Sequence, residues 1–312
     1  MIGIFKRIFS NIAFWIFLGV TMALLVDPLG DFTSTAVMVV LMSQMIVSMH
    51  GLSLKRNDLK RNGRFALLSV ICCFGISAAT ALLIGIPFIG SHHELWIGFV
   101  VLAATPSAVS VVTIAFYLNG NMGMTTISTM VVYLFALLIT PTMTFILVGE
   151  AVNPIKIFEY VLLFIAIPLL IVLPLKNVKV DRGKRKMAIN VLMCLLIFLT
   201  LNHSKGEVQG IQDLLIPIIL LCFLRTFGIS LIMIRLLRGR CPVDRGITYV
   251  SMSIWKNSGL ASTLCVILVA GSMAAIPCII SLIVETVWFA YMGTGFERHW
   301  GHGNRPDDVE MA

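Results

Sequence analysis

The stretch Ser251-Met-Ser-Ile-Trp-Lys-Asn-Ser-Gly-Leu-Ala-Ser-Thr263 places a lysine and an amide side chain inside a long apolar run. Apolar residues continue on both sides, so Lys256 and Asn257 lie far from either end of the run. An ammonium at such a depth in a membrane costs roughly 3 kcal/mol on insertion scales. The position therefore indicates a cavity, a partner charge or a ligand beside Lys256.

A lysine close to a membrane surface extends its ammonium to the headgroups, which is the alternative for Lys256. Arg245 lies eleven positions earlier, or roughly 16 Å of helix, which is about half the hydrocarbon thickness and argues against that alternative. Gly259 follows Asn257 and Ser258 and allows the helix to open and expose backbone carbonyl groups. We therefore expect a broken helix here.

The composition indicates an integral membrane protein with several spans. Of the 312 residues, 58% are hydrophobic and 12% are charged, with a mean hydropathy of +0.98; soluble domains carry about 25% charged residues. The net charge of +8 does not indicate nucleic acid, because the basic residues form short clusters between apolar runs. The seven cysteines lack the spacing of a metal site or a disulfide framework. We expect no cofactor and no metal.

Ten apolar runs are long enough to cross about 30 Å of hydrocarbon. They lie near residues 8–26, 32–52, 65–89, 95–118, 122–148, 157–175, 187–202, 212–237, 246–270 and 273–293. The first follows two basic residues as in a signal peptide, but it is long for one and has no cleavage site, so we interpret it as a span.

The basic residues predict the orientation of these spans. With a cytoplasmic N-terminus, 19 of the 23 Lys and Arg fall in cytoplasmic segments, whereas Lys156 and Lys205 fall in outer segments and Arg225 and Lys256 within spans. This asymmetry predicts that both termini are cytoplasmic, in a multi-pass protein of the cell membrane.

The chain divides into two halves of five spans, residues 1–150 and 151–294, followed by a cytoplasmic tail at 295–312. Because each half has an odd number of spans, two repeats would be inverted relative to each other, as in many secondary transporters. Polar and helix-breaking residues interrupt the fourth span of each half, at Thr105–Ser110 and at Trp255–Gly259. Paired breaks predict a substrate site near the midplane, although Pro106 alone is also explained by a simple kink.

At these residues the chain resembles the bile acid:sodium symporter family. The matching motifs are Pro106 to Thr113, Asn119-Gly-Asn121, Thr125 to Thr129 with Thr140-Pro141, and Lys256-Asn-Ser-Gly-Leu-Ala261. The resemblance implies an all-α fold of ten transmembrane helices in two inverted five-helix repeats. It also implies that the broken spans 4 and 9 cross, and that a core of spans 3–5 and 8–10 lies beside a panel of spans 1, 2, 6 and 7.

The chain departs from the family at the positions that hold sodium. Members bind the ion through side-chain oxygen atoms, whereas the matching positions here are Val111, Val112, Met252, Lys256 and Cys73. Only Thr125 and Thr129 keep hydroxyl groups. Since a hard cation requires several oxygen ligands, we expect no bound sodium and a sodium-independent protein.

Lys256 falls where the family would coordinate sodium, so its ammonium can act as a tethered cation. Arg225 and Glu285 also lie within spans, and we expect them to pair, because a lone buried charge is costly. A pair that only holds the helices together is the structural alternative. The three residues together leave one surplus positive charge, which suits an anion.

The sequence thus predicts a secondary active transporter of a small organic anion in the lipid bilayer. The candidate residues of its substrate and ion site are Lys256, Asn257, Ser258, Pro106, Ser107, Ser110, Thr113, Thr125, Thr129, Arg225 and Glu285. An enzyme is disfavoured, because the spans lack a carboxylate dyad and a Ser-His pair. An arsenite permease-like carrier using Cys73, a sodium-coupled symporter with rearranged sites, and a channel or receptor of the same fold stay open.

Protons are the other ion to which transport of the anion could be coupled. If Glu285 pairs with Arg225, Lys256 could release its proton in the empty carrier, whereas contact with Glu285 would keep the lysine charged. We expect a fixed cation, because Asn257, Ser258, Thr125 and Thr129 offer hydrogen-bond acceptors for the ammonium.

Overall fold

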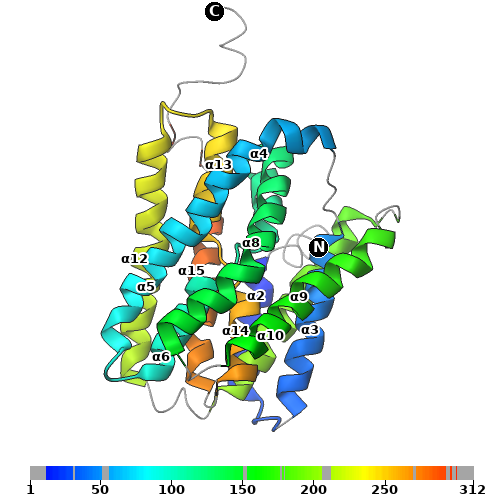
Figure 1. Ribbon diagram of the computed structural model, residues 1–312. Helices are drawn as coiled ribbons and strands as arrows, with labels where there is room; N and C mark the ends of the chain where they lie inside the picture. The colour runs from blue at the N-terminus through cyan, green and yellow to red at the C-terminus, as the bar shows by residue number, and fades with distance from the viewer. Residues whose placement is uncertain are drawn as a thin grey trace, which may run out of the picture.

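The computed structural model describes residues 12–30, 32–50, 56–149, 153–175, 178, 180–205, 212–269, 272–292, 296 and 300. The regular secondary structure of these residues is helical, and an isolated antiparallel bridge joins Ser107 and Lys256 (Figure 1). The α-helices are α2 (Ile12–Leu25), α3 (Phe32–Met49), α4 (Arg56–Val70), α5 (Ala78–Gly85), α6 (His93–Ala104), α7 (Ser110–Tyr117), α8 (Met122–Val148), α9 (Pro154–Leu175), α10 (Arg182–His203), α12 (Gln212–Leu237), α13 (Val243–Ile254), α14 (Ser258–Leu268) and α15 (Ile276–Met292). A π-helical segment, η1 (Ile71–Ser77), and two 3₁₀ segments, η2 (Ile86–Phe88) and η5 (Ser272–Ala275), complete the set.

Seven helical segments of the described chain are long and apolar enough to cross a membrane. They are Phe32–Met49, Asn62–Phe88, Met122–Val148, Ile155–Val172, Gly183–His203, Gln212–Leu237 and Met273–Met292, and they correspond to seven of the spans predicted from the sequence. At the other three predicted spans the structure has shorter apolar helices, Phe14–Leu25, His93–Ala104 and Ser258–Leu268. The prediction of a multi-pass, all-helical membrane protein is confirmed.

Large apolar side chains cover much of the outer surface of the helices. Leu138 is 69% exposed, Ile146 71% and Ile216 67%. Exposed apolar surface on this scale marks contact with a partner or a membrane rather than with water. On seven helices of spanning length, it is the surface that faces lipid.

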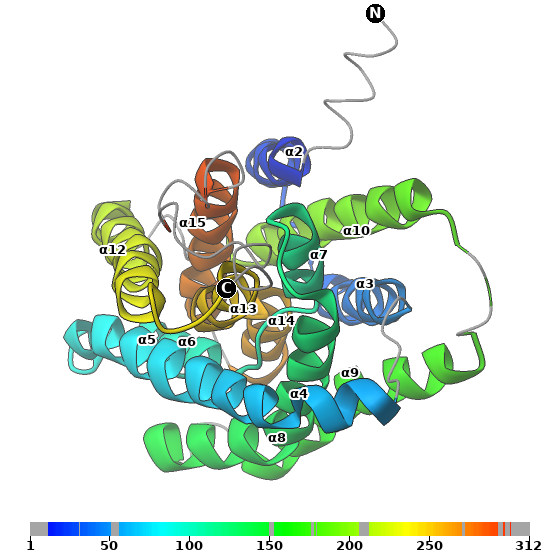
Figure 2. The same cartoon turned by 90° about the horizontal axis from the view of Figure 1, so that it is seen from above.

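One group of four helices lies against one side of the second broken span, and other helices lie against its opposite side. Helix α10 packs against α2 and α3, and α3 packs against α9; we call α2, α3, α9 and α10 the four-helix group. Helix α14 contacts α3, α9 and α10 of this group on one side and α6 and α15 on the other. Seen from above, α13 and α14 lie near the centre (Figure 2). The break between α13 and α14 is therefore enclosed by both sets of helices.

Both predicted breaks are present, and they lie side by side. Helix α6 ends at Ala104, because Pro106 disfavours helical backbone at Thr105, which is extended with φ −73° and ψ 153°. Helix α13 ends at Ile254, and Asn257 begins α14 as its N-cap. The two breaks are joined by hydrogen bonds from the Asn257 N–H to the Pro106 oxygen (2.8 Å) and from the Ala108 N–H to the Trp255 oxygen (3.3 Å).

Candidate functional site

Lys256 lies fully buried between α13 and α14. Its Nζ donates hydrogen bonds to the backbone oxygens of Ala103 (2.8 Å), Thr105 (2.8 Å) and Cys73 (3.0 Å). It also lies 3.6 Å from Cys73 Sγ and 5.1 Å from the centroid of the Phe74 ring. Three carbonyl acceptors match the three N–H donors of a protonated lysine, whereas a neutral amine would turn its lone pair towards one of the oxygens. The geometry therefore fits the charged form.

The cage around Lys256 is made largely by the C-terminal end of α6. The last carbonyl groups of a helix lack intrahelical partners and carry partial negative charge. Lys256 Nζ donates to the backbone oxygens of Ala103 and Thr105. Thr140 Oγ1 of α8 donates to the oxygen of Ala104 at 2.7 Å. The third cage oxygen, that of Cys73, lies in η1, where the π-helical turn departs from the regular α-helical ladder. Lys256 thus caps a helix that ends inside the protein.

Arg225 of α12 caps the other broken helix in the same way. Its Nη2 donates to the oxygen of Ile254, the last residue of α13, at 3.1 Å and to Ser77 Oγ at 3.0 Å. Its Nη1 donates to Ser281 Oγ at 2.9 Å and to Glu285 Oε1 at 3.2 Å. Both charged side chains are 0% exposed, and the predicted Arg225–Glu285 ion pair is confirmed.

The two caps differ in how their charge is balanced. Glu285 balances Arg225, and Ser281 Oγ also donates to Glu285 Oε1 at 3.0 Å. Lys256 Nζ forms no hydrogen bond to a carboxylate among the residues that the structure describes; its contacts are carbonyl oxygens, a sulfur and an aromatic ring. The Glu285 carboxylate instead lies against the backbone N–H of Lys256. With Lys256 protonated, the three side chains Arg225, Glu285 and Lys256 together carry one surplus positive charge.

Asn257 points to the opposite side of the chain, towards the four-helix group. Its Nδ2 donates to Tyr133 OH of α8 at 2.8 Å and to Met45 Sδ of α3 at 3.6 Å. Its Oδ1 accepts from the Leu260 N–H at 3.0 Å, which caps the N-terminus of α14. One side chain thus fixes the start of α14 and joins it to α8 and α3.

The first turn of α14 packs closely against α3 and α10. A Cβ atom on Gly259 would lie 2.8 Å from Leu196 Cδ2 of α10 and 3.7 Å from Gln44 Oε1 of α3. Gly259 is the second residue of α14 and follows the break at residues 255–257 directly. A Cβ at this position would force the end of the Leu196 side chain of α10 to shift. Ser258 is 2% exposed, and its Oγ has no hydrogen-bond partner among the described residues.

The other candidates in the first break have local roles. Pro106 contributes its carbonyl oxygen to the pairing of the breaks, and Ser107 Oγ donates to the Met252 oxygen at 3.1 Å. Ser110 and Thr113 lie half-buried on α7, near the break but outside the contacts of Lys256. The structure brings the two broken segments together, as expected, through their backbones.

The expectation that side-chain oxygens hold the ammonium is wrong. Thr125 Oγ1 donates to the Asn121 oxygen at 2.8 Å and lies 2.7 Å from Thr248 Oγ1, and Thr129 Oγ1 donates to the Thr125 oxygen at 2.8 Å. A threonine in a helix bonds readily to the carbonyl one turn back, and these hydroxyls do so. Asn257 and Ser258 likewise do not contact Lys256 Nζ; backbone carbonyls do.

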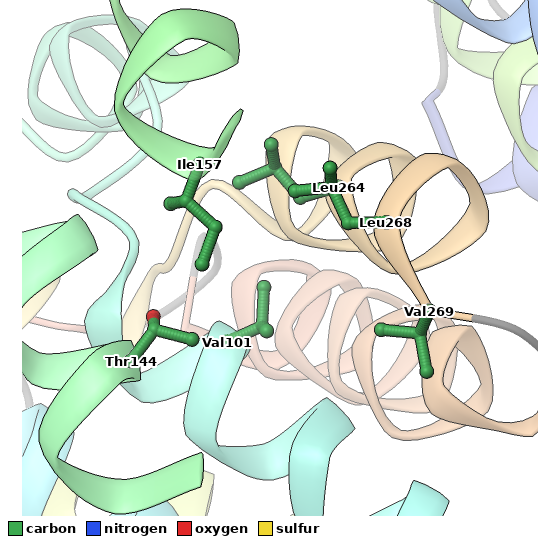
Figure 3. A pocket seen from close by; sticks show the side chains of 6 residues that line it. All are labelled: Val101, Thr144, Ile157, Leu264, Leu268 and Val269. Atoms are coloured by element: carbon green, nitrogen blue, oxygen red, sulfur yellow. The ribbon is translucent and has the colours of Figure 1, made fainter. Parts of the chain in front are cut away.

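A narrow, mostly apolar crevice lies farther along α14 and has no room for a water molecule. Figure 3 shows its lining, Val101, Thr144, Ile157, Leu264, Leu268 and Val269. A wider hollow of 430 Å³ on α8, between Leu138 and Leu147, is open to the surroundings and apolar. Neither space is lined by Lys256.

Sequence reasoning missed several residues of the site. The oxygens of Ala103 and Thr105 belong to the backbone, which leaves no pattern in a sequence. Ser77 and Ser281 hold Arg225 but are too common as residue types to attract notice.

The family of the chain emerges from a comparison with sequence models of known families. The sequence model of the Sodium Bile acid symporter family matches residues 35–207, which is more than half of the chain. The match includes η1, the first break and the helices of α3 to α10, and it ends before Arg225, Lys256 and Glu285. No curated protein matches the sequence.

Proposed function

The chain belongs to the sodium bile acid symporter family, and from this premise we propose that it is a secondary active transporter of a small organic anion in which Lys256 replaces bound sodium. Family membership supports the coarser statement, a symporter-like transporter rather than an enzyme. The substitution of lysine for sodium rests on the surroundings of Lys256.

The observation that carries the proposal is the carbonyl cage. Backbone oxygens at the C-terminal ends of broken helices are the groups that bind sodium in secondary transporters. Here the oxygens of Ala103, Thr105 and Cys73 are all occupied by Lys256 Nζ, at 2.8 to 3.0 Å. An ion that entered would have to displace the lysine. The positive charge is therefore permanent, and uptake does not need sodium.

The second broken helix supports the same conclusion. Its C-terminal oxygen, on Ile254, accepts from Arg225 Nη2 at 3.1 Å. Each half-helix that ends inside the membrane thus carries a fixed cation where a mobile one would otherwise bind. The Sγ of Cys73 and the three oxygens of the cage also face Lys256, which leaves the thiol no open side for an arsenite-type ligand in this state.

The architecture we propose is ten spans in two inverted five-helix repeats, with both termini cytoplasmic in the cell membrane. The matched breaks, each capped by a buried cation, support it, as do the three shorter apolar helices at the remaining predicted spans. On this proposal the four-helix group is the panel, and the other helices are the core.

The substrate is an anion because the breaks carry one surplus positive charge at Lys256, reinforced by the N-terminal end of α14. Protons do not couple to transport through Lys256, because its three N–H donors are matched by three acceptors and the lysine keeps its proton throughout.

The test is uptake by purified protein in proteoliposomes. Radiolabelled monocarboxylates from acetate to decanoate, taurocholate and arsenite are offered in sodium, potassium and choline buffers. We expect saturable, counterflow-stimulated uptake of at least one organic anion that is equal in the three buffers. Uptake that requires sodium would favour a sodium-coupled symporter, uptake of arsenite alone would favour the arsenite carrier, and flux without counterflow would indicate a channel.

A further inference from the structure

We infer that Trp300 is a positioning residue of the transporter: it packs on Gly246 and holds α13, the first half of the second broken span, in register with the first break. The inference rests on the proposed function, because it assigns a part in transport to a residue that lies after the last span. The sequence predicts a cytoplasmic tail at residues 295–312, yet Phe296 and Trp300 within it are only 3% and 2% exposed. At these two residues the segment therefore packs against the helices.

The indole of Trp300 lies directly on the backbone of α13. A Cβ atom on Gly246 would stand 2.0 Å from Cη2 and 2.5 Å from Cζ2 of the ring, closer than packed carbon atoms approach. A glycine inside a helix is less favourable than an alanine, and Gly246 does not have a positive φ that would call for one. The indole thus occupies the space where a side chain at position 246 would lie.

An apolar cluster surrounds this contact and connects it to three helices. The rings of Phe296 and Trp300 stack with centroids 5.8 Å apart and an angle of 24° between their planes. The same cluster includes Ile234 of α12, Ile247 of α13 and Met292 of α15. Because a tryptophan buries a large apolar surface, the contact ties the chain after α15 firmly to the start of α13.

Trp300 and Arg225 hold opposite ends of α13. The oxygen of Ile254, the last residue of this helix, accepts from Arg225 Nη2 at 3.1 Å. Gly246 lies eight positions earlier, or about 12 Å of helix. Every residue of α13 from Gly246 to Ile254 is buried. A short helix that is enclosed in this way shifts as a unit, so a displacement at Gly246 reaches the break.

The break depends on the exact position of α13. The oxygen of Trp255 accepts from the Ala108 N–H at 3.3 Å, and the Asn257 N–H donates to the Pro106 oxygen at 2.8 Å. Without Trp300 this paired arrangement is occupied for a smaller fraction of the time. The apparent affinity for the substrate falls with the fraction of protein that is competent to bind. Loss of the contact therefore raises the half-saturating concentration of the anion, whereas a loss of folded protein would lower only the maximal rate.

A native thiol reports the position of α13 without any substrate. Cys241 is half-buried, lies two positions before α13 begins at Val243, and packs against the cluster that contains Trp300. The other six cysteines are buried. The rate at which a fluorescent maleimide labels the full chain in detergent therefore measures the exposure of Cys241, with Cys241→Ser as the background.

The test combines this labelling with uptake of radiolabelled hexanoate, a monocarboxylate of the series named above, into proteoliposomes. In Trp300→Ala and Gly246→Ala we expect labelling of Cys241 about fivefold faster and half-saturation about fivefold higher than in wild type, with maximal uptake per folded protein within about twofold. Trp300→Phe in the Gly246→Ala background should restore both values, because the smaller ring leaves room for the methyl group. The controls are Phe145→Ala, an exposed aromatic residue of α8, and Gly228→Ala, where a Cβ meets nothing within 4 Å; neither value should change.

Each contrary result has a separate meaning. Unchanged labelling in both variants overturns the contact, and faster labelling with wild-type half-saturation overturns the positioning role; in both cases the transporter proposal stands. Lower maximal uptake at wild-type half-saturation would assign Trp300 to folding alone and also overturn the positioning role. If wild type takes up no organic anion of the series, the proposed function fails and the positioning role fails with it.

Discussion

Ser107 and Lys256 face each other in an antiparallel bridge that joins the two helix breaks. The bonds on either side of the bridge, between Asn257 and Pro106 and between Ala108 and Trp255, use backbone groups that the broken helices leave free. Because the backbone groups of each break form hydrogen bonds with those of the other, neither break can shift alone without leaving buried polar groups unpaired. Lys256 adds a side-chain connection in the same place, from the second break to the end of α6.

Lys256→Met is expected to abolish anion uptake at every pH and to lower stability. The change leaves three buried carbonyl oxygens without their donor, at about 1–3 kcal/mol for each unsatisfied group. The melting temperature and hexanoate uptake are measured beside Lys184→Met, which removes an exposed lysine of α10. Full uptake by Lys256→Met would show that the fixed cation is unnecessary.

Lys256→Ala is expected to create a site for a free cation. The cage oxygens of Ala103, Thr105 and Cys73 stay in place, and the missing side chain leaves room for an ion. Sodium or methylammonium should raise the melting temperature of this variant and leave that of wild type unchanged. A wild type that is stabilised by millimolar sodium would contradict the replacement of sodium by lysine.

Uptake by wild type is expected to be independent of a proton gradient. The three acceptors around Lys256 Nζ favour the protonated lysine, so we expect that it keeps its proton during transport. Uptake is compared with and without a pH difference across the vesicle membrane, using a proton ionophore to collapse it. Accumulation that follows the imposed gradient would assign proton coupling to the protein.

Arg225→Met is expected to destabilise the protein more than the double variant Arg225→Met/Glu285→Gln. The single change leaves the Glu285 carboxylate buried and unpaired, which costs about 3–5 kcal/mol, whereas the double change removes both charges. A double-mutant cycle of unfolding free energies, completed by Glu285→Gln, measures the coupling between them. Additive effects would mean that the pair has no energetic role.

Gly259→Ala is expected to impair transport, and Leu196→Ala is expected to relieve it. The new Cβ would lie 2.8 Å from Leu196 Cδ2, closer than packed carbon atoms approach. Gly228→Ala is the matched control, because it also lies inside a helix and a Cβ there meets nothing within 4 Å. If Gly259→Ala and Gly228→Ala behave alike in uptake and melting temperature, the close approach of α10 is unimportant.

The sequence alone determined that this chain is a helical membrane protein with two interrupted spans. Apolar run length reports the thickness of the hydrocarbon directly, and Pro106 interrupts a helix through a local steric effect at Thr105. The pairing of Arg225 with Glu285 was also predictable from the sequence. Few charges lie within spans, and burial forces those that do to find each other.

Only the tertiary structure decided what surrounds Lys256. Its acceptors lie 153 and 183 positions earlier for Ala103 and Cys73, and they are backbone oxygens, which every residue type possesses. Thr125 and Thr129 were plausible acceptors by residue type, but their hydroxyls bond to their own helix one turn back. A sequence shows which side chains can bond, whereas the choice among backbone groups depends on where the broken helices end in space.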